Sequence, residues 1–184
     1  MPGHTRAQEA LFAFCFGSLS IGVLGLVAYL AREPFLFPSL GPTAFLVFHR
    51  PTASAASPRN AIQGHLIGVV SGVAAIWIFG VMDAPDALSQ FSLTRALAAG
   101  LSLGMTSARM VALDRGHPPA GATTLIVSLG LMRTPRQLAI LMAAVVLLIA
   151  LGWLVHKVAR TTYPMWAPSK PPSPFTGERN EAEP

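Results

Sequence analysis

The sequence is short of charged residues and of cysteine. Asp, Glu, Lys and Arg together make up 11% of its 184 residues, whereas a soluble domain of this size carries about 25%. Because 52% of the chain is hydrophobic, this composition excludes an ordinary soluble domain and indicates an integral membrane protein. The single cysteine, Cys15, rules out an intrachain disulfide and a metal site built from several cysteines.

The sequence also lacks the usual material of an enzyme active site. Its eight Asp and Glu residues lie mostly between apolar runs or near the C-terminus, which leaves little for catalysis by paired carboxylates. None of the HExxH, GxSxG and Walker-type phosphate-loop patterns occurs. His65 and His117 have no further ligands clustered near them in the sequence, so they make a weak metal site. We therefore expect a protein that is not an enzyme and that binds no metal and no cofactor.

Long apolar runs are what the sequence does contain. Four of them approach or exceed the length of about 20 residues that a membrane-spanning helix needs, and they cover 11–31, 61–81, 93–113 and 138–158. The first run is longer than the apolar core of a signal peptide, so we expect it to be a retained span. The net charge of +5 comes mostly from basic residues between the runs, which indicates topology signals rather than a nucleic-acid surface. We expect a multi-pass protein in contact with lipid, in the bacterial cytoplasmic (inner) membrane.

Two shorter apolar segments, 35–49 and 119–132, each lie between two long runs and have a proline near their start. The halves of the chain align without a gap at an offset of 77 residues. Prolines and arginines then coincide on both flanks of the short segments: Pro42 with Pro119, Pro58 with Pro135, and Arg59 with Arg136. The predicted fold class is therefore all-α integral membrane, with two related units that each contain a long helix, a short half helix and a long helix.

The relation between the two units depends on whether the short segments cross the membrane. If they cross, the second unit is inverted relative to the first, a plan that recurs in transporters with a substrate site near the midplane. If they are re-entrant, the units are parallel. The distribution of basic residues favours six membrane segments and hence inverted repeats. A helix of about 14 residues, however, rises only ~21 Å through a hydrocarbon core of ~30 Å.

The first short segment opens with SLGPT at 39–43, which is typical of a helix start. Proline is tolerated in the first helical turn, and a helix that begins inside the membrane presents N–H donors and a partial positive charge at that end. Ser39, Gly41 and Thr43 could therefore bind an anion. The same hydroxyls could instead cap the helix, and the sequence leaves both interpretations open.

The second short segment opens with GHPPAG at 116–121 and continues with two threonines. Its histidine could donate a hydrogen bond to a substrate, relay a proton or bond a carbonyl structurally. The threonines could face a pore or bond back to their own helix. The candidate substrate-binding residues here are His117, Pro119, Ala120, Gly121, Thr123 and Thr124.

The second long run adds two candidates, Arg59 and His65. Arg59 could pair with an anion or anchor the helix at lipid headgroups, whereas His65 lies deeper in the run. A GxxxGxxxG stripe at 64–72 favours close helix packing in lipid, and the spacing recurs at 100–104. From these stripes we expect a homo-oligomer.

The C-terminal part of the chain differs in composition from the rest. We assign 1–160 to one integral membrane domain and 161–184 to a proline-rich, polar C-terminal tail, which has the composition of a disordered extension. Such a tail could also recruit a partner. The alternative function is therefore a non-transporting membrane scaffold or sensor that acts through this tail.

The HPPAG stretch at 117–121 resembles the signature of the HPP family of integral membrane proteins. The stretches FPSLGPTA at 37–44, PRN at 58–60 and GH at 64–65 resemble the other block shared by that family. The resemblance covers about 11–158. It implies a membrane transporter, usually described with four transmembrane helices. Nitrite is the leading substrate, because family members of cyanobacteria and chloroplast envelopes have been linked to nitrite transport.

Together these features predict a transporter or channel for a small inorganic anion, with nitrite as the leading candidate. The anion would be held at the N-termini of the two short helices, where hydroxyls, His117 and backbone N–H groups replace its water shell. Apart from His65, we expect no fixed charge inside the long runs, which fits weak binding and rapid passage.

Overall fold

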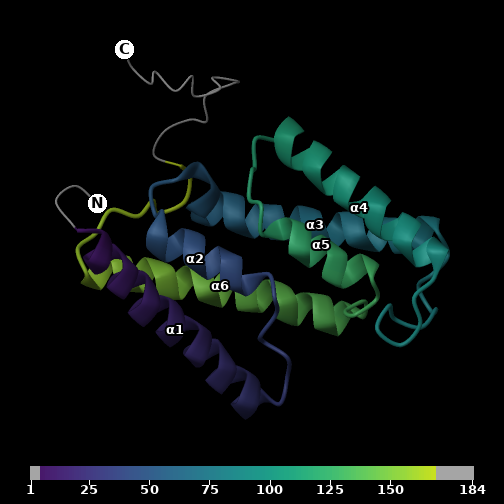
Figure 1. The fold of residues 1–184 in the computed structure, drawn as a ribbon, viewed down its shortest axis with the longest axis horizontal. Coiled ribbons are helices and arrows are strands. Elements are labelled where there is room, and N and C mark those ends of the chain that lie inside the picture. Colours follow the sequence, from purple (N-terminus) through teal and green to yellow (C-terminus); the bar gives the residue numbers. More distant parts are fainter. Residues whose placement is uncertain (1–4, 169–184) are drawn as a thin grey trace.

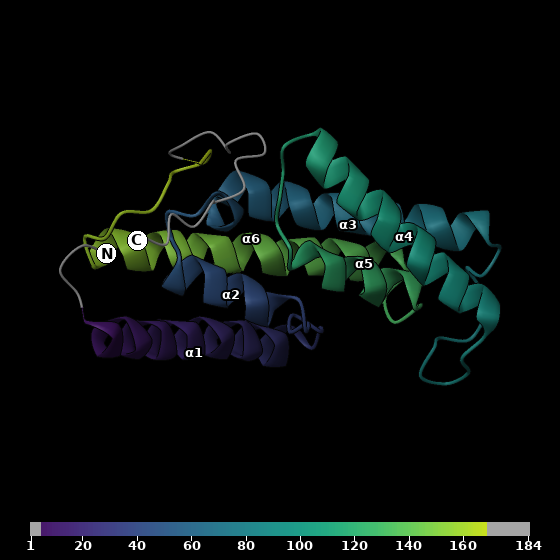
Figure 2. The ribbon, with the colours of Figure 1, turned by 45° about the horizontal axis from the view of Figure 1, so that its top comes forward.

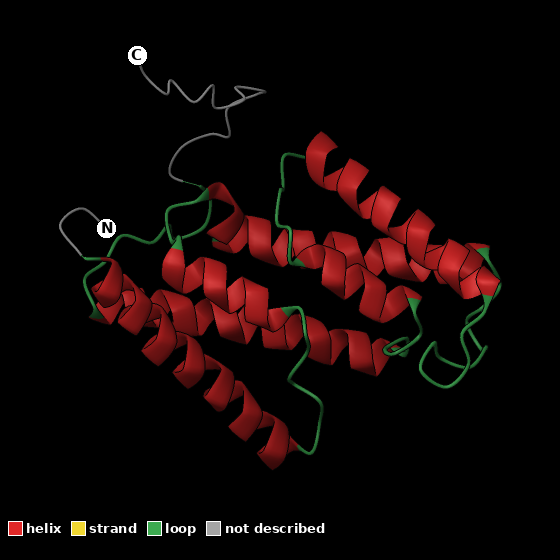
Figure 3. Ribbon diagram, viewed as in Figure 1, coloured by secondary structure: helices red, strands yellow, loops and turns green. Residues whose placement is uncertain are grey.

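Within residues 5–168, which the computed structural model describes, the chain consists of helices and loops and contains no strand (Figure 3). The predicted all-α class is confirmed. A short 3-10 helix, η1 (Ser54–Ala56), precedes the third α-helix. The α-helices are α1 (Arg6–Ala31), α2 (Leu40–His49), α3 (Pro58–Ile78), α4 (Leu93–Ala112), α5 (Ala120–Ser128) and α6 (Pro135–Val158).

The four long helices occupy the four predicted runs to within a few residues. Three of them, α1, α3 and α6, are long and apolar enough to cross a membrane. The fourth, α4, is as long as a span but more polar, since its buried face carries Arg95, Ser102 and Thr106. The short helices α2 and α5 contain 10 and 9 residues. Each therefore rises only about 15 Å, roughly half of the hydrocarbon thickness.

Successive helices run in alternating directions. In Figure 1, α1, α3 and α5 run from left to right, and α2, α4 and α6 run from right to left. The short helices α2 and α5 begin beside each other near the centre of the molecule and run apart (Figures 1 and 2). The directions of the second three helices are thus the reverse of the first three. An inverted repeat requires this arrangement, although the repeat itself stays a prediction.

The packing of the helices has the same exchange symmetry. Each short helix contacts the first helix of its own unit, α1 with α2 and α4 with α5. Each third helix packs on the other unit, α3 on α4 and α5, and α6 on α1 and α2. The two third helices also contact each other, so exchanging the units leaves the set of contacts among the six α-helices unchanged.

Glycines allow the short helices to approach the long ones closely. A Cβ atom added at Gly72 of α3 would lie 2.7 Å from Cβ of Val127 in α5, and one at Gly152 of α6 would lie 2.5 Å from Cγ1 of Val47 in α2. These positions accept no larger side chain without movement. The predicted packing role of the 64–72 stripe is confirmed, whereas a Cβ at either glycine of the 100–104 pair would meet nothing within 4 Å.

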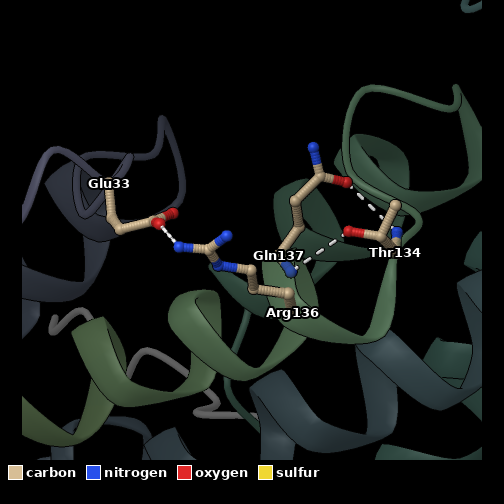
Figure 4. Close-up of polar contacts among 4 residues, drawn as sticks. All are labelled: Glu33, Thr134, Arg136 and Gln137. Carbon is tan, nitrogen blue, oxygen red and sulfur yellow. Dashed lines mark hydrogen bonds and ion pairs between the residues drawn. The ribbon is translucent and has the colours of Figure 1, made fainter.

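The third helix of each unit begins with a capped proline. Ser57 accepts a hydrogen bond from an N–H of the first turn of α3, and Thr134 forms a capping box with Gln137 at the start of α6 (Figure 4). Arg136, the second residue of α6, forms an ion pair with Glu33, which lies in the loop between α1 and α2 (Figure 4). Because the Arg136 side chain is 78% exposed, this pair contributes little stability.

The first residues of the predicted tail contact the membrane domain. The Tyr163 hydroxyl donates a hydrogen bond of 2.9 Å to the Ala56 carbonyl, and the ring stacks on His156. Burial raises the pKa of Tyr163. The Trp166 carbonyl accepts the Arg59 N–H at 2.9 Å. The rest of the tail, from residue 169 onward, lies outside the described residues.

Candidate functional site

The N-terminal ends of α2 and α5 meet at four fully buried polar side chains. We call them the central polar cluster: Thr43 on α2, His65 on α3, His117 just before α5, and Thr123 on α5. Each has an exposed fraction of 0%. Burying polar atoms in a membrane protein costs free energy unless they are hydrogen-bonded, so the arrangement of these atoms determines what the cluster can do.

The cluster joins three segments that are far apart in sequence. Oγ1 of Thr43 lies 3.0 Å from Nε2 of His65 and 3.2 Å from Nε2 of His117. The two Nε2 atoms lie 3.2 Å from each other. On the other side of its ring, His65 places Nδ1 at 2.6 Å from Oγ1 of Thr123. Both short helices therefore contribute to one hydrogen-bonded network.

The orientation of His117 is fixed by its neighbours. Its Nδ1 lies 2.7 Å from the Ala55 carbonyl of η1, and because a carbonyl only accepts, Nδ1 carries a hydrogen. When the ring is neutral, its Nε2 therefore presents a lone pair to the cluster. Close approach of this ring to α3 requires glycine, since a Cβ at Gly64 would lie 2.7 Å from Cβ of His117.

These contacts select one arrangement of hydrogens when both rings are neutral. The lone pair on Nε2 of His117 must face a donor, and we infer that His65 supplies it from Nε2. Nδ1 of His65 then accepts from the hydroxyl of Thr123. Thr43 donates to the Ser39 carbonyl at 2.9 Å, so every cluster atom has a partner and the cluster carries no charge.

Unlike the hydroxyl of Thr43, the hydroxyl of Ser39 forms no hydrogen bond. The side chain is 0% exposed, yet its Oγ has no hydrogen-bond partner and does not cap the helix. An unpaired buried hydroxyl is destabilising by about 1–3 kcal/mol. Ser39 thus retains an unused donor one helical turn from Thr43.

The backbone amides at the start of α5 are not free, which corrects the expectation that they replace the water shell of a substrate. The N–H groups of Ala120 and Gly121 donate to the carbonyls of His117 and Pro118, both at 3.0 Å. The next N–H bonds to the Pro119 carbonyl at 3.1 Å. These short-range bonds satisfy the donors locally. The dipoles of both short helices still direct their positive ends toward the cluster.

Three of the predicted site residues lie away from the central polar cluster. Gly41 is exposed, in a shallow surface pocket between α1 and α2. Arg59 hydrogen-bonds to the side chain of Asn60 at the start of α3. Gly121 faces α4, where an added Cβ would lie 3.4 Å from Cδ1 of Leu103. The structure therefore does not bring these residues together with His65 and the rest.

The remaining predicted residues of α5 have packing roles. Pro119 is the N-cap of α5, and the carbonyl of Ala120 would lie 2.8 Å from a Cβ at Gly68. Thr124 donates to that carbonyl at 3.0 Å and shares a hydrogen bond of 2.8 Å with Thr106 of α4. Of the two threonines, Thr124 bonds back to its own helix and Thr123 joins the cluster.

A second buried polar group lies at the opposite end of α5. We call it the arginine clamp: Arg95 on α4 and Arg133 in the loop before α6. Arg95 is 1% exposed and donates to the carbonyls of Ala84 at 2.7 Å and Pro85 at 2.8 Å. Arg133 also donates to the Ala84 carbonyl. Gly130, at φ +80°, lets the Arg95 guanidinium lie against the backbone, since a Cβ there would be 2.9 Å from it.

Sequence reasoning missed the arginines of α4. The expectation of no fixed charge in the long runs is wrong, because Arg95 is buried and Arg109 donates to Oγ of Ser71 on α3 at 2.9 Å. Treating basic residues as topology signals does not separate those inside a run from those between runs. A signal was available in the presence of two arginines within an apolar run, which marks a helix with a polar buried face.

Comparison with known proteins agrees with the membrane character of the fold. The chain is 30% identical over 154 residues to a transmembrane protein of Dictyostelium discoideum. The aligned part covers 78% of this chain and 50% of the relative, so the chain spans about half the length of that relative. No solved structure matches the chain. Residues 2–164 match the family described as HPP, transmembrane region. With most of its length covered by that match, this chain belongs to the HPP family of transmembrane proteins.

Proposed function

We propose that this protein carries a small inorganic anion across the membrane, with nitrite as the leading substrate. The observation that carries the proposal is the meeting of the N-termini of α2 and α5 at the central polar cluster. Two helix dipoles add positive potential at this point. The hydroxyls and imidazoles of the cluster are hydrogen-bond donors that an anion can accept from.

The chemistry of the cluster suits a singly charged anion that must also leave. Within residues 5–168, no carboxylate hydrogen-bonds to Thr43, His65, His117 or Thr123. Neutral donors bind an anion more weakly than a fixed guanidinium does, and weak binding permits passage. Nitrite has one negative charge and two acceptor oxygens, and its choice over other small anions rests on the resemblance to family members linked to nitrite transport.

The cluster is closed in this conformation. Its four side chains are fully buried and bond to one another, so an anion must separate Thr43 from the two imidazoles in order to enter. Each short helix packs on a long helix of the other unit, and relative movement of the two units would open the contact between them. We infer an alternating opening of this kind rather than a permanently open pore.

The setting of this activity follows from the composition and the outer surface. We place the protein in the bacterial cytoplasmic membrane as a homo-oligomer without enzymatic activity. Gly100 and Gly104 of α4 are exposed, and a Cβ added at either would meet nothing within 4 Å, which leaves this helix face available to a second copy.

Uptake into liposomes tests the proposal. Purified protein is reconstituted, and the entry of nitrite, nitrate, formate and chloride is compared with that into empty liposomes. Thr43→Val removes one hydroxyl and preserves shape, so we expect nitrite uptake to fall by about tenfold, because a hydrogen bond to a charged group contributes about 1.5–3 kcal/mol. Thr94→Val, at an exposed site on α4, is the matched control and should transport normally. Uptake equal to that of empty liposomes for all four anions would overturn the proposed function.

A further inference from the structure

The two imidazoles of the central polar cluster share a proton position. The Nε2 atoms of His65 and His117 lie 3.2 Å apart, which is a hydrogen-bond distance only if one of them carries a hydrogen and the other does not. Because the Ala55 carbonyl fixes the hydrogen of His117 on Nδ1, the neutral pair holds one hydrogen between the Nε2 atoms.

The geometry leaves one place for an additional proton. Protonation of Nε2 of His117 would point two N–H groups at each other across 3.2 Å. Nδ1 of His65 instead accepts from Thr123 at 2.6 Å, and its protonation merely reverses that hydrogen bond. His65 then donates to Oγ1 of Thr123. The hydroxyl of Thr123 keeps its hydrogen and can donate it in a hydrogen bond to another acceptor.

Protonation therefore prepares the cluster for an anion in two ways. It adds one positive charge to a site that carries none, and it frees the hydroxyl of Thr123 as a donor. A singly charged anion that accepts from this hydroxyl restores neutrality inside the membrane, where an unbalanced charge is costly. The unpaired hydroxyl of Ser39 is a second free donor near α2.

Other charged or titratable groups near the cluster have contacts elsewhere. Arg109 donates to Ser71, and His156 bonds to the Val47 carbonyl. Among residues 5–168, none of the remaining titratable groups on neighbouring elements hydrogen-bonds to either imidazole. They are His49 on α2, Arg59 on α3, Arg95 on α4, Asp114 and Arg115 before α5, and Arg136 and Lys157 on α6.

We propose that His65 and His117 take up one proton with each anion, so that the protein moves proton and anion together. This inference rests on the proposed function and adds the proton as a second substrate. On one side of the membrane the proton binds the lone pair of Nδ1 in His65 and the anion accepts from Thr123. On the other side both leave, Thr123 donates to His65 again, and no net charge has crossed.

Liposome transport with two readouts tests this coupling. The full-length protein is reconstituted into liposomes that contain a pH-sensitive dye, in slightly alkaline buffer where nitrous acid is scarce. Isotope-labelled nitrite is added outside, and valinomycin with a potassium gradient sets the membrane potential. We expect nitrite and protons to enter in equal amounts. Below saturation, the rate of nitrite uptake should rise about tenfold for each unit by which the external pH is lowered. It should not change with the membrane potential.

A variant identifies the group that holds the proton. His65→Gln keeps hydrogen-bonding capacity but does not titrate, so we expect its residual nitrite uptake to lose the dependence on pH. His49→Gln makes the same change outside the cluster and should retain that dependence. A monodisperse elution profile confirms that each variant is folded, and His65→Asn, which likewise does not titrate, replaces His65→Gln if the latter is not.

The outcomes separate the two proposals. Nitrite uptake that follows the membrane potential, without entry of protons, would overturn the coupling and leave the proposed function intact. Coupling that persists in the folded His65 variant would also overturn the assignment to this pair. If no anion enters above the level of empty liposomes, the proposed function and the coupling fail together.

Discussion

The central polar cluster and the arginine clamp lie at opposite ends of α5 and use different chemistry. The clamp contains two guanidinium groups, which stay charged at any physiological pH. Its hydrogen bonds in the described part of the chain go to carbonyl oxygens. The cluster contains imidazoles and hydroxyls, which can be neutral and can exchange donor and acceptor roles.

The difference indicates how this small domain divides stability from binding. Permanent charge lies where backbone carbonyls need donors, at the loop after α3 and the C-terminal end of α5. At the meeting point of α2 and α5 the groups can be neutral and can exchange the roles of hydrogen-bond donor and acceptor. A guanidinium there would hold an anion strongly and slow its release. We therefore expect changes in the clamp to affect mainly stability, and changes in the cluster to affect mainly transport.

The largest effect should come from Arg95→Ala. This change leaves the carbonyls of Ala84 and Pro85 with fewer donors and empties a buried site beside Gly130, so we expect the free energy of unfolding to fall by about 3–5 kcal/mol. Thermal unfolding in detergent measures it. Arg50→Ala, at an exposed arginine, is the control, and an equally small loss for both would mean that the clamp is not structural.

An intermediate effect is expected for Gly64→Ala, because an added Cβ would lie 2.7 Å from Cβ of His117. Overpacking of this kind costs about 1–3 kcal/mol, and it moves His117 away from His65. Transport should therefore fall more than stability does. Gly104→Ala introduces the same methyl group where nothing lies within 4 Å. If both variants transport equally well, the approach of His117 to α3 is not required.

The smallest effect on stability should come from Ser39→Ala. Because the Ser39 hydroxyl is buried without a partner, we expect its removal to leave the free energy of unfolding unchanged or raise it by about 1 kcal/mol. Nitrite affinity should fall severalfold, since a free donor is lost. Denaturation and uptake kinetics measure the two quantities. A clear loss of stability would show that the hydroxyl makes a structural bond instead.

Much of this arrangement was predictable from composition and spacing. The apolar runs locate the four long helices, and Pro42 and Pro119 indicate where the short helices begin. The stripe at 64–72 predicts close helix packing, and in the structure its glycines allow α5 to pack closely on α3. These features are local or periodic, so they can be read along one segment at a time.

What could not be predicted depends on contacts between distant segments. His65 and His117 are 52 residues apart, and no periodicity indicates that their rings touch. The role of Arg95 requires the path of the loop that it binds. The amides of α5 were expected to be free, but the short-range bonds formed around Pro118 and Pro119 depend on local backbone geometry. The sequence could not show that Gly121 lies away from the central polar cluster, because that depends on which face of α5 packs on α3.

The central claim is that a small anion binds where α2 and α5 begin. NMR of protein with isotopically labelled histidine, titrated with nitrite in detergent, tests it most directly. The account predicts that the imidazole signals of His65 and His117 shift together and saturably, while those of His49 and His156 stay unchanged. Signals of His65 and His117 that do not respond, or that respond no more than those of His49 and His156, would contradict it.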